Sequence, residues 1–459
     1  MNQREIPLGI DPHIIQKGLN KPIEFYKGKL IANKDNISFQ IDGKIQLVWF
    51  PFSSLRFELK GTEELQDNEF NQLDCGDKID LIILGQENTV LEGKITYKSA
   101  SPVIRGEIID TKADENKQSE RQASYAKFFI PNFRYIIGRP IRYQRQDSGF
   151  SDGNRLSLSA KGWNITLDAL SDIDQLQTDL INYSGFAITH YGILEKNDRS
   201  LFDYQESKEI VDALKWYLSF VRGSFINPYA LIGFNADHNE VWKGWNGWKF
   251  SRMFPYHNNI SWVGKFPPQT FEEPFKGFAD LYFDPEWSDS LKRIVHIYVE
   301  SQHPAMSREG AIILLQSALE LLAYEILVEK NQVLSKTKFD GRSTSGERIK
   351  LLFDQLKIPL EISEHLEDLH MQTIHRQAKG KNWLAPDAIT QIRGYIVHLT
   401  KKNRIKLNDH SQEACDVLDL CRWSLELCIL KLCNYNGVYT NRLKRTQYQG
   451  DVDSVPWDS

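Results

Sequence analysis

The spacing of apolar residues changes once along this chain, near Pro267-Pro268. Before that point, short runs rich in β-branched and aromatic residues follow one another at intervals typical of antiparallel strands. After it, apolar residues recur every three or four positions, as they do on one face of a helix. At 459 residues the chain exceeds the usual size of one core. The sequence therefore predicts an α+β protein, in which a β-rich N-terminal region with sandwich-like or barrel-like strands precedes an all-α helical bundle.

We expect the β-rich region to span residues 1–270 and the helical domain, with a C-terminal tail, to span 271–459. The β-rich region is expected to divide near 111–124, which is polar and highly charged, or near 170–200. Asp42-Gly43 is typical of a turn between two strands. The strand-like runs of the first part cover residues 23–32, 37–41, 45–49, 55–59, 79–84, 89–97 and 103–109.

The helical half contains five segments that we expect to be helical. The first, at 307–329, carries apolar residues at three- and four-residue steps. The second begins at 344 and ends at Lys357-Ile358-Pro359, since proline cannot continue a helix. A short helix near 361–370 and an apolar run at 389–403 come before the last helix, at 411–433. Within the β-rich half, one helix is expected at 206–221.

Arg393 and His398 lie near the end of the apolar run at 389–403. Arginine carries a permanent charge in a planar fork that fits phosphate oxygens. Histidine is the side chain best suited to move a proton near neutral pH. Together they supply the groups that metal-free RNA cleavage needs, so Arg393 and His398 are the candidate catalytic residues. The alternative is a surface arginine and a partly buried histidine, an arrangement found in many helices.

The spacing of the two residues limits how they can act together. An ideal helix turns about 100° per residue, so five steps place the side chains about 140° apart. Residues on one face are three or four positions apart. For both side chains to reach one phosphate, the helix must end or distort near His398, or a second copy of the helix must complete the site. The run Thr400-Lys401-Lys402-Asn403 is typical of a helix terminus, with cations in the last turn.

The order of these helices, the phrases ALELLAYEIL and ERIKLLFDQLKIP, and the Arg/His pair together resemble the HEPN family of all-α ribonuclease domains. That family carries an R-x4-6-H motif on a late helix. The resemblance covers residues 290–445 and is closest to the larger HEPN domains that end ApeA-type bacterial anti-phage proteins. It implies an endoribonuclease of anti-phage defence, acting by abortive infection, with a phage-derived or cellular trigger.

The resemblance also implies a mechanism. The ribose 2′-hydroxyl attacks the adjacent phosphate without a metal or cofactor, His398 transfers protons, and Arg393 offsets the extra negative charge of the transition state. Two motif helices meet across the two-fold axis of a homodimer, so each arginine serves the other subunit's histidine. Gly394 departs from the family pattern, because active members usually carry Asn or Asp there. We interpret it as permitting close backbone contact, with Tyr395 or Ile396 filling the interface.

A basic stretch surrounds the pair: residues 371–406 hold eight cations and one anion, a net charge of +7 in a chain of net charge −5. Such a zone attracts the RNA backbone, and a solvated surface is the alternative. Glu320, which could orient His398 across the bundle, and Asn403 are candidate supporting residues. The candidate RNA-binding residues are Lys401, Lys402, Arg376, Lys379 and Lys381.

Five cysteines without C-x2-C spacing make a zinc site unexpected, and we expect no metal and no cofactor. Reduced thiols, no signal peptide and no uninterrupted membrane-length apolar run indicate a cytoplasmic protein with no membrane partner. Two other functions remain open. One is a non-catalytic HEPN protein that binds RNA or a partner. The other is a β-domain carbohydrate or peptide binder with a helical dimerisation domain, in which Trp242, Trp245 and Trp248 stack on a ligand rather than pack on the sheet.

Overall fold

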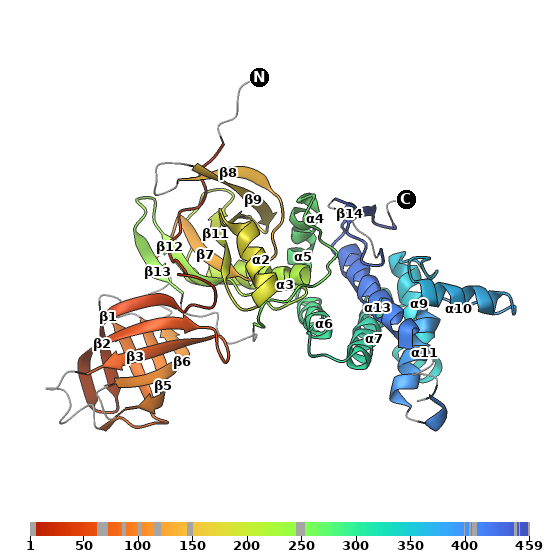
Figure 1. The fold of residues 1–459 in the computed structure, drawn as a ribbon, viewed down its shortest axis with the longest axis horizontal. Helices are drawn as coiled ribbons and strands as arrows, with labels where there is room; N and C mark the ends of the chain where they lie inside the picture. Colours follow the sequence, from red (N-terminus) through yellow and green to blue (C-terminus); the bar gives the residue numbers. More distant parts are fainter. Residues whose placement is uncertain are drawn as a thin grey trace, which may run out of the picture.

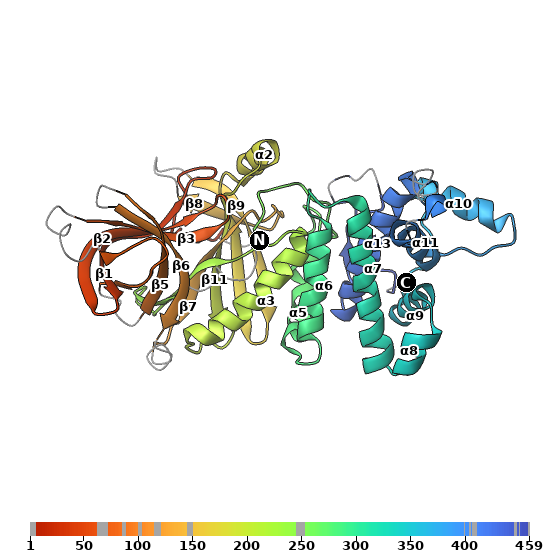
Figure 2. The ribbon, with the colours of Figure 1, turned by 90° about the horizontal axis from the view of Figure 1, so that it is seen from below.

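The structure is a computed structural model, and three parts follow one another along its long axis: a strand barrel, a second sheet and a helical region (Figures 1 and 2). The predicted α+β class, with a β-rich region before a helical one, is confirmed. The change from barrel to second sheet falls between residues 113 and 125, whereas residues 170–200 lie within the second sheet region. The described residues are 6–61, 72–84, 89–99, 103–113, 121–144, 150–244, 253–398, 400–403, 405, 411–444, 448 and 450–457.

The first sheet is a closed barrel in which every neighbouring pair of strands is antiparallel. The strand order is β1-β2-β3-β6-β5-β4. Alternate residues, such as Leu55, Phe57 and Leu59 of β3, are buried, because successive side chains of a strand point to opposite faces. The strands are β1 (Ile23–Lys34), β2 (Ile37–Val48), β3 (Ser54–Lys60), β4 (Lys78–Ile83), β5 (Thr89–Lys98) and β6 (Val103–Ala113).

The turn expected at Asp42-Gly43 is wrong, because β2 runs through both residues. Gly43 pairs with Gly28 on one side and Leu59 on the other. A Cβ atom at Gly43 would lie 2.6 Å from Leu30 Cδ1, so glycine here serves close packing inside the barrel. Asp42-Gly43 thus lies at a closely packed point within one long strand, whereas the sequence predicted a turn between two short strands at this position.

The second sheet is antiparallel and buried on both faces. In β7, Phe128 and Ile130 belong to the core shared with the helices, while Phe129 between them belongs to the core shared with the barrel. Because successive side chains of a strand point to opposite faces, β7 packs on the helices with one face and on the barrel with the other. The sheet order is β13-β12-β7-β11-β10-β9-β8. Its strands are β7 (Tyr125–Pro131), β8 (Arg139–Gln144), β9 (Phe150–Ala160), β10 (Trp163–Ala169), β11 (Ile188–Lys196), β12 (Tyr229–Phe234) and β13 (Glu240–Lys243).

Trp242, on β13, is buried against Phe202 and Tyr204, so this tryptophan packs on the sheet. Trp245 and Trp248 lie outside the described residues. Two helices accompany this sheet, α2 (Ile173–Tyr183) and α3 (Tyr204–Arg222), and the second confirms the helix expected at 206–221. A capping box formed by Asp203 and Glu206 fixes the start of α3.

The helical region confirms the long periodic segments and adds helices α4, α5, α6 and α8, which were not predicted. The short third helix begins at Glu367, later than expected, after a loop that follows Pro359. A two-stranded sheet of β14 (Val438–Tyr439) and β15 (Asp453–Ser454) closes the chain. The helices are α4 (Gln269–Glu272), α5 (Pro274–Phe283), α6 (Ser288–Ser301), α7 (Arg308–Tyr324) with a π-helical continuation η3 (Glu325–Lys330), α8 (Lys336–Arg342), α9 (Ser345–Leu356), α10 (Glu367–Gln377), α11 (Ala385–Val397) and α13 (Ser411–Leu432).

Helix α7 with its continuation, Arg308–Lys330, is the one helix of the described chain that is long and apolar enough to cross a membrane. Its most apolar window is 56% buried inside the protein. It packs against α6, α9, α11 and α13, so it is the central helix of the bundle.

A buried ion pair joins the chain end to the bundle. The Arg442 guanidinium donates from Nε to Glu426 Oε2 at 2.9 Å and from Nη2 to Glu426 Oε1 at 2.6 Å. Tyr298 OH, on α6, donates to the same carboxylate, and Arg442 Nη2 also donates to the carbonyl of Ile260 at 2.9 Å. Burial by itself lowers the pKa of Arg442, but the Glu426 carboxylate outweighs that effect and raises it above the ordinary value.

We expect Arg442→Met to destabilise the helical region by about 3–5 kcal/mol, because it leaves the buried Glu426 carboxylate without a counter-charge. Lys444→Met is the matched control, since Lys444 pairs with Asp451 and Asp453 nearer the surface and such pairs contribute about 0–1 kcal/mol. Urea unfolding followed by circular dichroism measures both. Equal losses in the two variants would contradict the role of the buried pair.

Candidate functional site

Helix α11 holds the candidate catalytic pair on a well-anchored element. Pro386 stands at its first turn, where proline is favoured, and the Asp387 carboxylate accepts a hydrogen bond from Leu384 N–H. The buried face consists of Ala385, Ala388, Ile389 and Ile392, which packs on α7, α9 and α13. The apolar half of the helix thus fixes the direction in which its other residues point.

The helix ends at His398, which is one of the two alternatives that the spacing of the pair left open. His398 has φ −95° and ψ 85°, outside the helical region, while its N–H still donates to Gly394 O at 3.1 Å. Asn403 Nδ2 donates to His398 O at 2.8 Å, and Asn403 N–H donates to the Thr400 hydroxyl at 3.2 Å. Asn403 therefore closes the turn that sets the backbone of His398.

Neither candidate catalytic side chain has a hydrogen-bond or ion-pair partner among the residues that the structure describes. Arg393 is half-buried on α11, and His398 is exposed. A guanidinium and an imidazole left without protein partners at one helix end are available to a ligand. On an ideal helix the five-residue step would place the two side chains about 140° apart, but α11 ends at His398, whose backbone is no longer helical.

Glu320 on α7 interacts with neighbours other than His398. Its Oε1 accepts from Gln316 Nε2 at 2.9 Å and from the Ser345 hydroxyl, and its Oε2 lies 3.8 Å from Arg348 Nη1. These contacts hold α9 against α7. Glu320 thus links α7 to α9. Among the described residues it makes no contact with His398, so the structure does not support the orienting role that we considered for it.

The candidate RNA-binding residues fall into two groups, at opposite ends of α11. Arg376, Lys379 and Lys381 precede its first turn, whereas Lys401 and Lys402 follow its last. Helix α11 has 13 residues and is therefore about 20 Å long. The basic residues between 371 and 406 are thus divided into two separate groups, and only the second group is next to His398. In the first group, Arg376 stacks on Trp383 at 4.1 Å, and Lys379 Nζ lies 2.8 Å from His375 Nε2.

Gly394 faces open space: a Cβ atom there would meet no atom within 4 Å. Tyr395 and Ile396, which we expected to fill a dimer interface, instead pack partly against the bundle's own core. Val397 is 40% exposed. The free surface near the end of α11 therefore centres on Gly394 and Val397.

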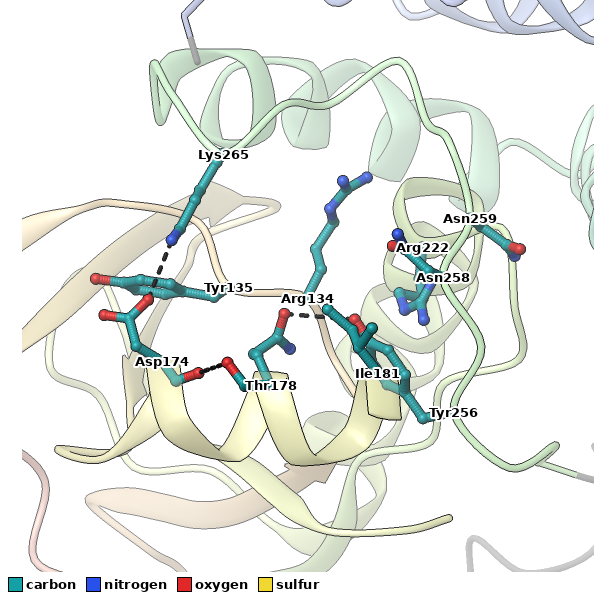
Figure 3. A pocket seen from close by; sticks show the side chains of 11 residues that line it. Arg134, Tyr135, Asp174, Thr178, Ile181, Arg222, Tyr256, Asn258, Asn259 and Lys265 are labelled. Carbon is teal, nitrogen blue, oxygen red and sulfur yellow. Dashed lines mark hydrogen bonds and ion pairs between the residues drawn. The ribbon is translucent and has the colours of Figure 1, made fainter. Parts of the chain in front are cut away.

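A second candidate site, which the sequence analysis missed, is a cavity of about 250 Å³ between α2 and the segment that leads into the helical region. Arg134 and Arg222 line it (Figure 3). The sequence feature that could have indicated this site is Arg134, a charged residue within the otherwise largely apolar run from Phe128 to Ile137. Among the described residues, no group of three or more His, Cys, Asp or Glu side chains is placed to hold a metal ion.

Two family models match parts of this chain. The match to the family described as YopA central domain covers residues 118–256, a range that includes the strands of the second sheet. The match to the YopA C-terminal domain covers residues 284–453, a range that includes Arg393 and His398. No solved structure matches the chain. A similar protein is the SPbeta prophage-derived uncharacterized protein YopA of Bacillus subtilis (strain 168), which is 27% identical over 455 residues and 98% of each chain.

Proposed function

We propose that this protein is a metal-independent endoribonuclease of the HEPN type, with Arg393 and His398 as its catalytic residues. The observation that carries the proposal is the end of α11, where a guanidinium and an imidazole stand without protein partners and a capping asparagine sets the backbone beside the imidazole. The ribose 2′-hydroxyl attacks the adjacent phosphorus and the bond to the 5′-oxygen breaks. The products carry a 2′,3′-cyclic phosphate and a 5′-hydroxyl.

The roles of the two residues follow from their charge. His398 transfers a proton to or from the reacting oxygens, and its exposed side chain is accessible for that role. Arg393 binds the scissile phosphate and compensates the charge that grows on it in the transition state. Lys401 and Lys402, just beyond His398, extend the positive field along the RNA backbone.

The site is composite: two α11 helices meet across a two-fold axis, and Arg393 of one subunit works with His398 of the other. This arrangement lets an arginine and a histidine reach one phosphate even where a single helix would separate them by about 140°, as an ideal helix does. The open space at Gly394 supports it, since a glycine without neighbours lets a second backbone approach. Two-fold dimers are the commonest symmetric oligomers.

We place the protein in the bacterial cytoplasm, where cleavage of RNA limits phage growth through abortive infection. The free thiols of its cysteines fit a reducing compartment. The prophage origin of the similar Bacillus subtilis protein supports a role in competition between phages. The β-rich region would then receive a phage-derived or cellular trigger.

A non-catalytic RNA- or partner-binding HEPN protein is the second candidate. Gly394 in place of the usual polar residue favours it, as does the split of the basic residues between the two ends of α11. Measuring RNA cleavage by the Arg393 and His398 variants distinguishes a ribonuclease from a non-catalytic binding protein.

His398→Ala and Arg393→Ala should each lower RNA cleavage by about 10²–10⁴-fold, since each removes a group that acts in the transition state. Because neither side chain has a partner in the described chain, unfolding free energies should change by no more than about 0.5 kcal/mol. The matched controls are His365→Ala and Arg342→Ala, which change exposed residues of the same region. Cleavage is followed on labelled RNA in EDTA with analysis of the ends. Full activity in both site variants, or 5′-phosphate products, rejects the assignment.

Gly394→Leu should abolish the dimer and the activity together while leaving the monomer at least as stable. Open space surrounds Gly394 in the monomer, and leucine favours a helix over glycine by about 0.8 kcal/mol. Gly341→Leu on α8 is the control, because a Cβ there also meets no atom within 4 Å. Sedimentation velocity gives the oligomeric state. A monomeric wild-type protein that cleaves RNA at full rate disproves the composite site.

A further inference from the structure

A cavity at the junction of the second sheet and the helical region contains more positive charge than its walls compensate. It is bounded by the chain after β7, by α2, by the end of α3 and by residues 256–265. In Figure 3 the Arg134 side chain rises into the middle of the cavity, with Tyr135 and Lys265 on one side and Arg222 and Asn258 on the other. The volume of about 250 Å³ equals roughly eight water molecules.

Arg134 is the unusual member. Its Nη1 atom is enclosed but has no hydrogen-bond partner, and no carboxylate among the described residues pairs with its guanidinium. Burial, together with the neighbouring charge of Arg222, lowers the pKa of Arg134 to about 10, so it stays protonated near neutral pH. An enclosed charge without a partner costs free energy, and proteins satisfy such groups with a counter-ion or ligand.

Arg222, at the end of α3, adds a second uncompensated charge. It is 2% exposed, and its guanidinium donates to two backbone carbonyls, from Nε to Asn132 O at 3.3 Å and from Nη2 to His257 O. It also stacks on Tyr256 at 4.5 Å. These neighbours hold the guanidinium in place but carry no negative charge.

The remaining charges of the cavity cancel. Lys265 Nζ lies 3.1 Å from Asp174 Oδ1, and this is the one lysine–carboxylate pair among the lining residues. Three cations and one carboxylate leave a net charge of +2, carried by the two arginines. A phosphate monoester or inorganic phosphate carries nearly two negative charges at neutral pH. Arginine forks are also the side chains best shaped for phosphate oxygens.

We propose that this cavity binds a small phosphate-bearing anion, with its phosphate between Arg134 and Arg222 and any organic part beside Asn258. The site is independent of the RNA cleavage proposed for α11, which lies in another part of the molecule. Residues 256–265 are also tied to the chain end, through Ile260 O to Arg442 and Trp262 O to Thr440. A bound anion therefore strengthens the wall that joins the second sheet to the helical bundle.

Isothermal titration calorimetry of the full chain with inorganic phosphate, adenosine 5′-monophosphate and adenosine tests the site. We expect the two phosphates to bind and adenosine to fail. Tighter binding of the monophosphate identifies an organic phosphate as the ligand class, and equal or tighter binding of inorganic phosphate identifies the free anion. Failure of both phosphates to bind at millimolar concentration overturns the proposal.

Arg134→Met should weaken phosphate binding by about tenfold or more, because a charged hydrogen-bond donor to the anion is lost. In phosphate-free buffer its melting temperature should equal or exceed that of the wild type, a result that a purely structural role for Arg134 would not give. Arg199→Met, at an exposed turn, is the control and should bind normally. Asn258→Asp, which adds a carboxylate at an exposed position of the cavity, should also weaken binding. Unchanged affinity in both cavity variants contradicts the site.

Discussion

The buried pair of Arg442 and Glu426 is the interaction on which the junction of the molecule depends. A guanidinium and a carboxylate that are both almost fully enclosed must satisfy each other, since either alone would be strongly destabilising. The same arginine reaches Tyr298 on α6 and the carbonyl of Ile260. One side chain therefore fixes the chain end, the bundle and the segment that walls the cavity, and these parts must form together.

Much of the fold could be predicted from the spacing of apolar residues in the sequence. Helices α3, α7, α9 and α13 lie where the apolar spacing predicted them, because each buries one long face. Tertiary packing explains the difference at Gly43, where a turn-like dipeptide lies in an uninterrupted strand that packs on Leu30. Helices α2, α4, α5, α6 and α8 were not predicted. The double-sided burial of β7, with Phe128 and Phe129 in different cores, depends on contacts distant in sequence.

The candidate sites were predictable to different degrees. The sequence predicted a helix terminus at Thr400-Lys401-Lys402-Asn403 with cations in the last turn, whereas α11 ends earlier, at His398, and its last turn holds no cation. Asn403 instead donates back to the carbonyl of His398. Local sequence could not show that Glu320 is held by Ser345 and Arg348, nor that the basic residues lie at two ends of one helix. Arg134 and Arg222 are 88 positions apart and meet only in the fold. Both proposed sites thus depend on charged or titratable side chains that the packing leaves without a counter-charge.

Mixing of inactive subunits tests the composite ribonuclease site most directly. Arg393→Ala and His398→Ala proteins are purified separately, dissociated, combined in equal amounts and assayed on RNA. If each site takes its arginine from one subunit and its histidine from the other, a mixed dimer contains one intact site. Half of the dimers are mixed, so the mixture should regain about one quarter of wild-type activity. A mixture that forms dimers and stays as inactive as its two components would contradict the account.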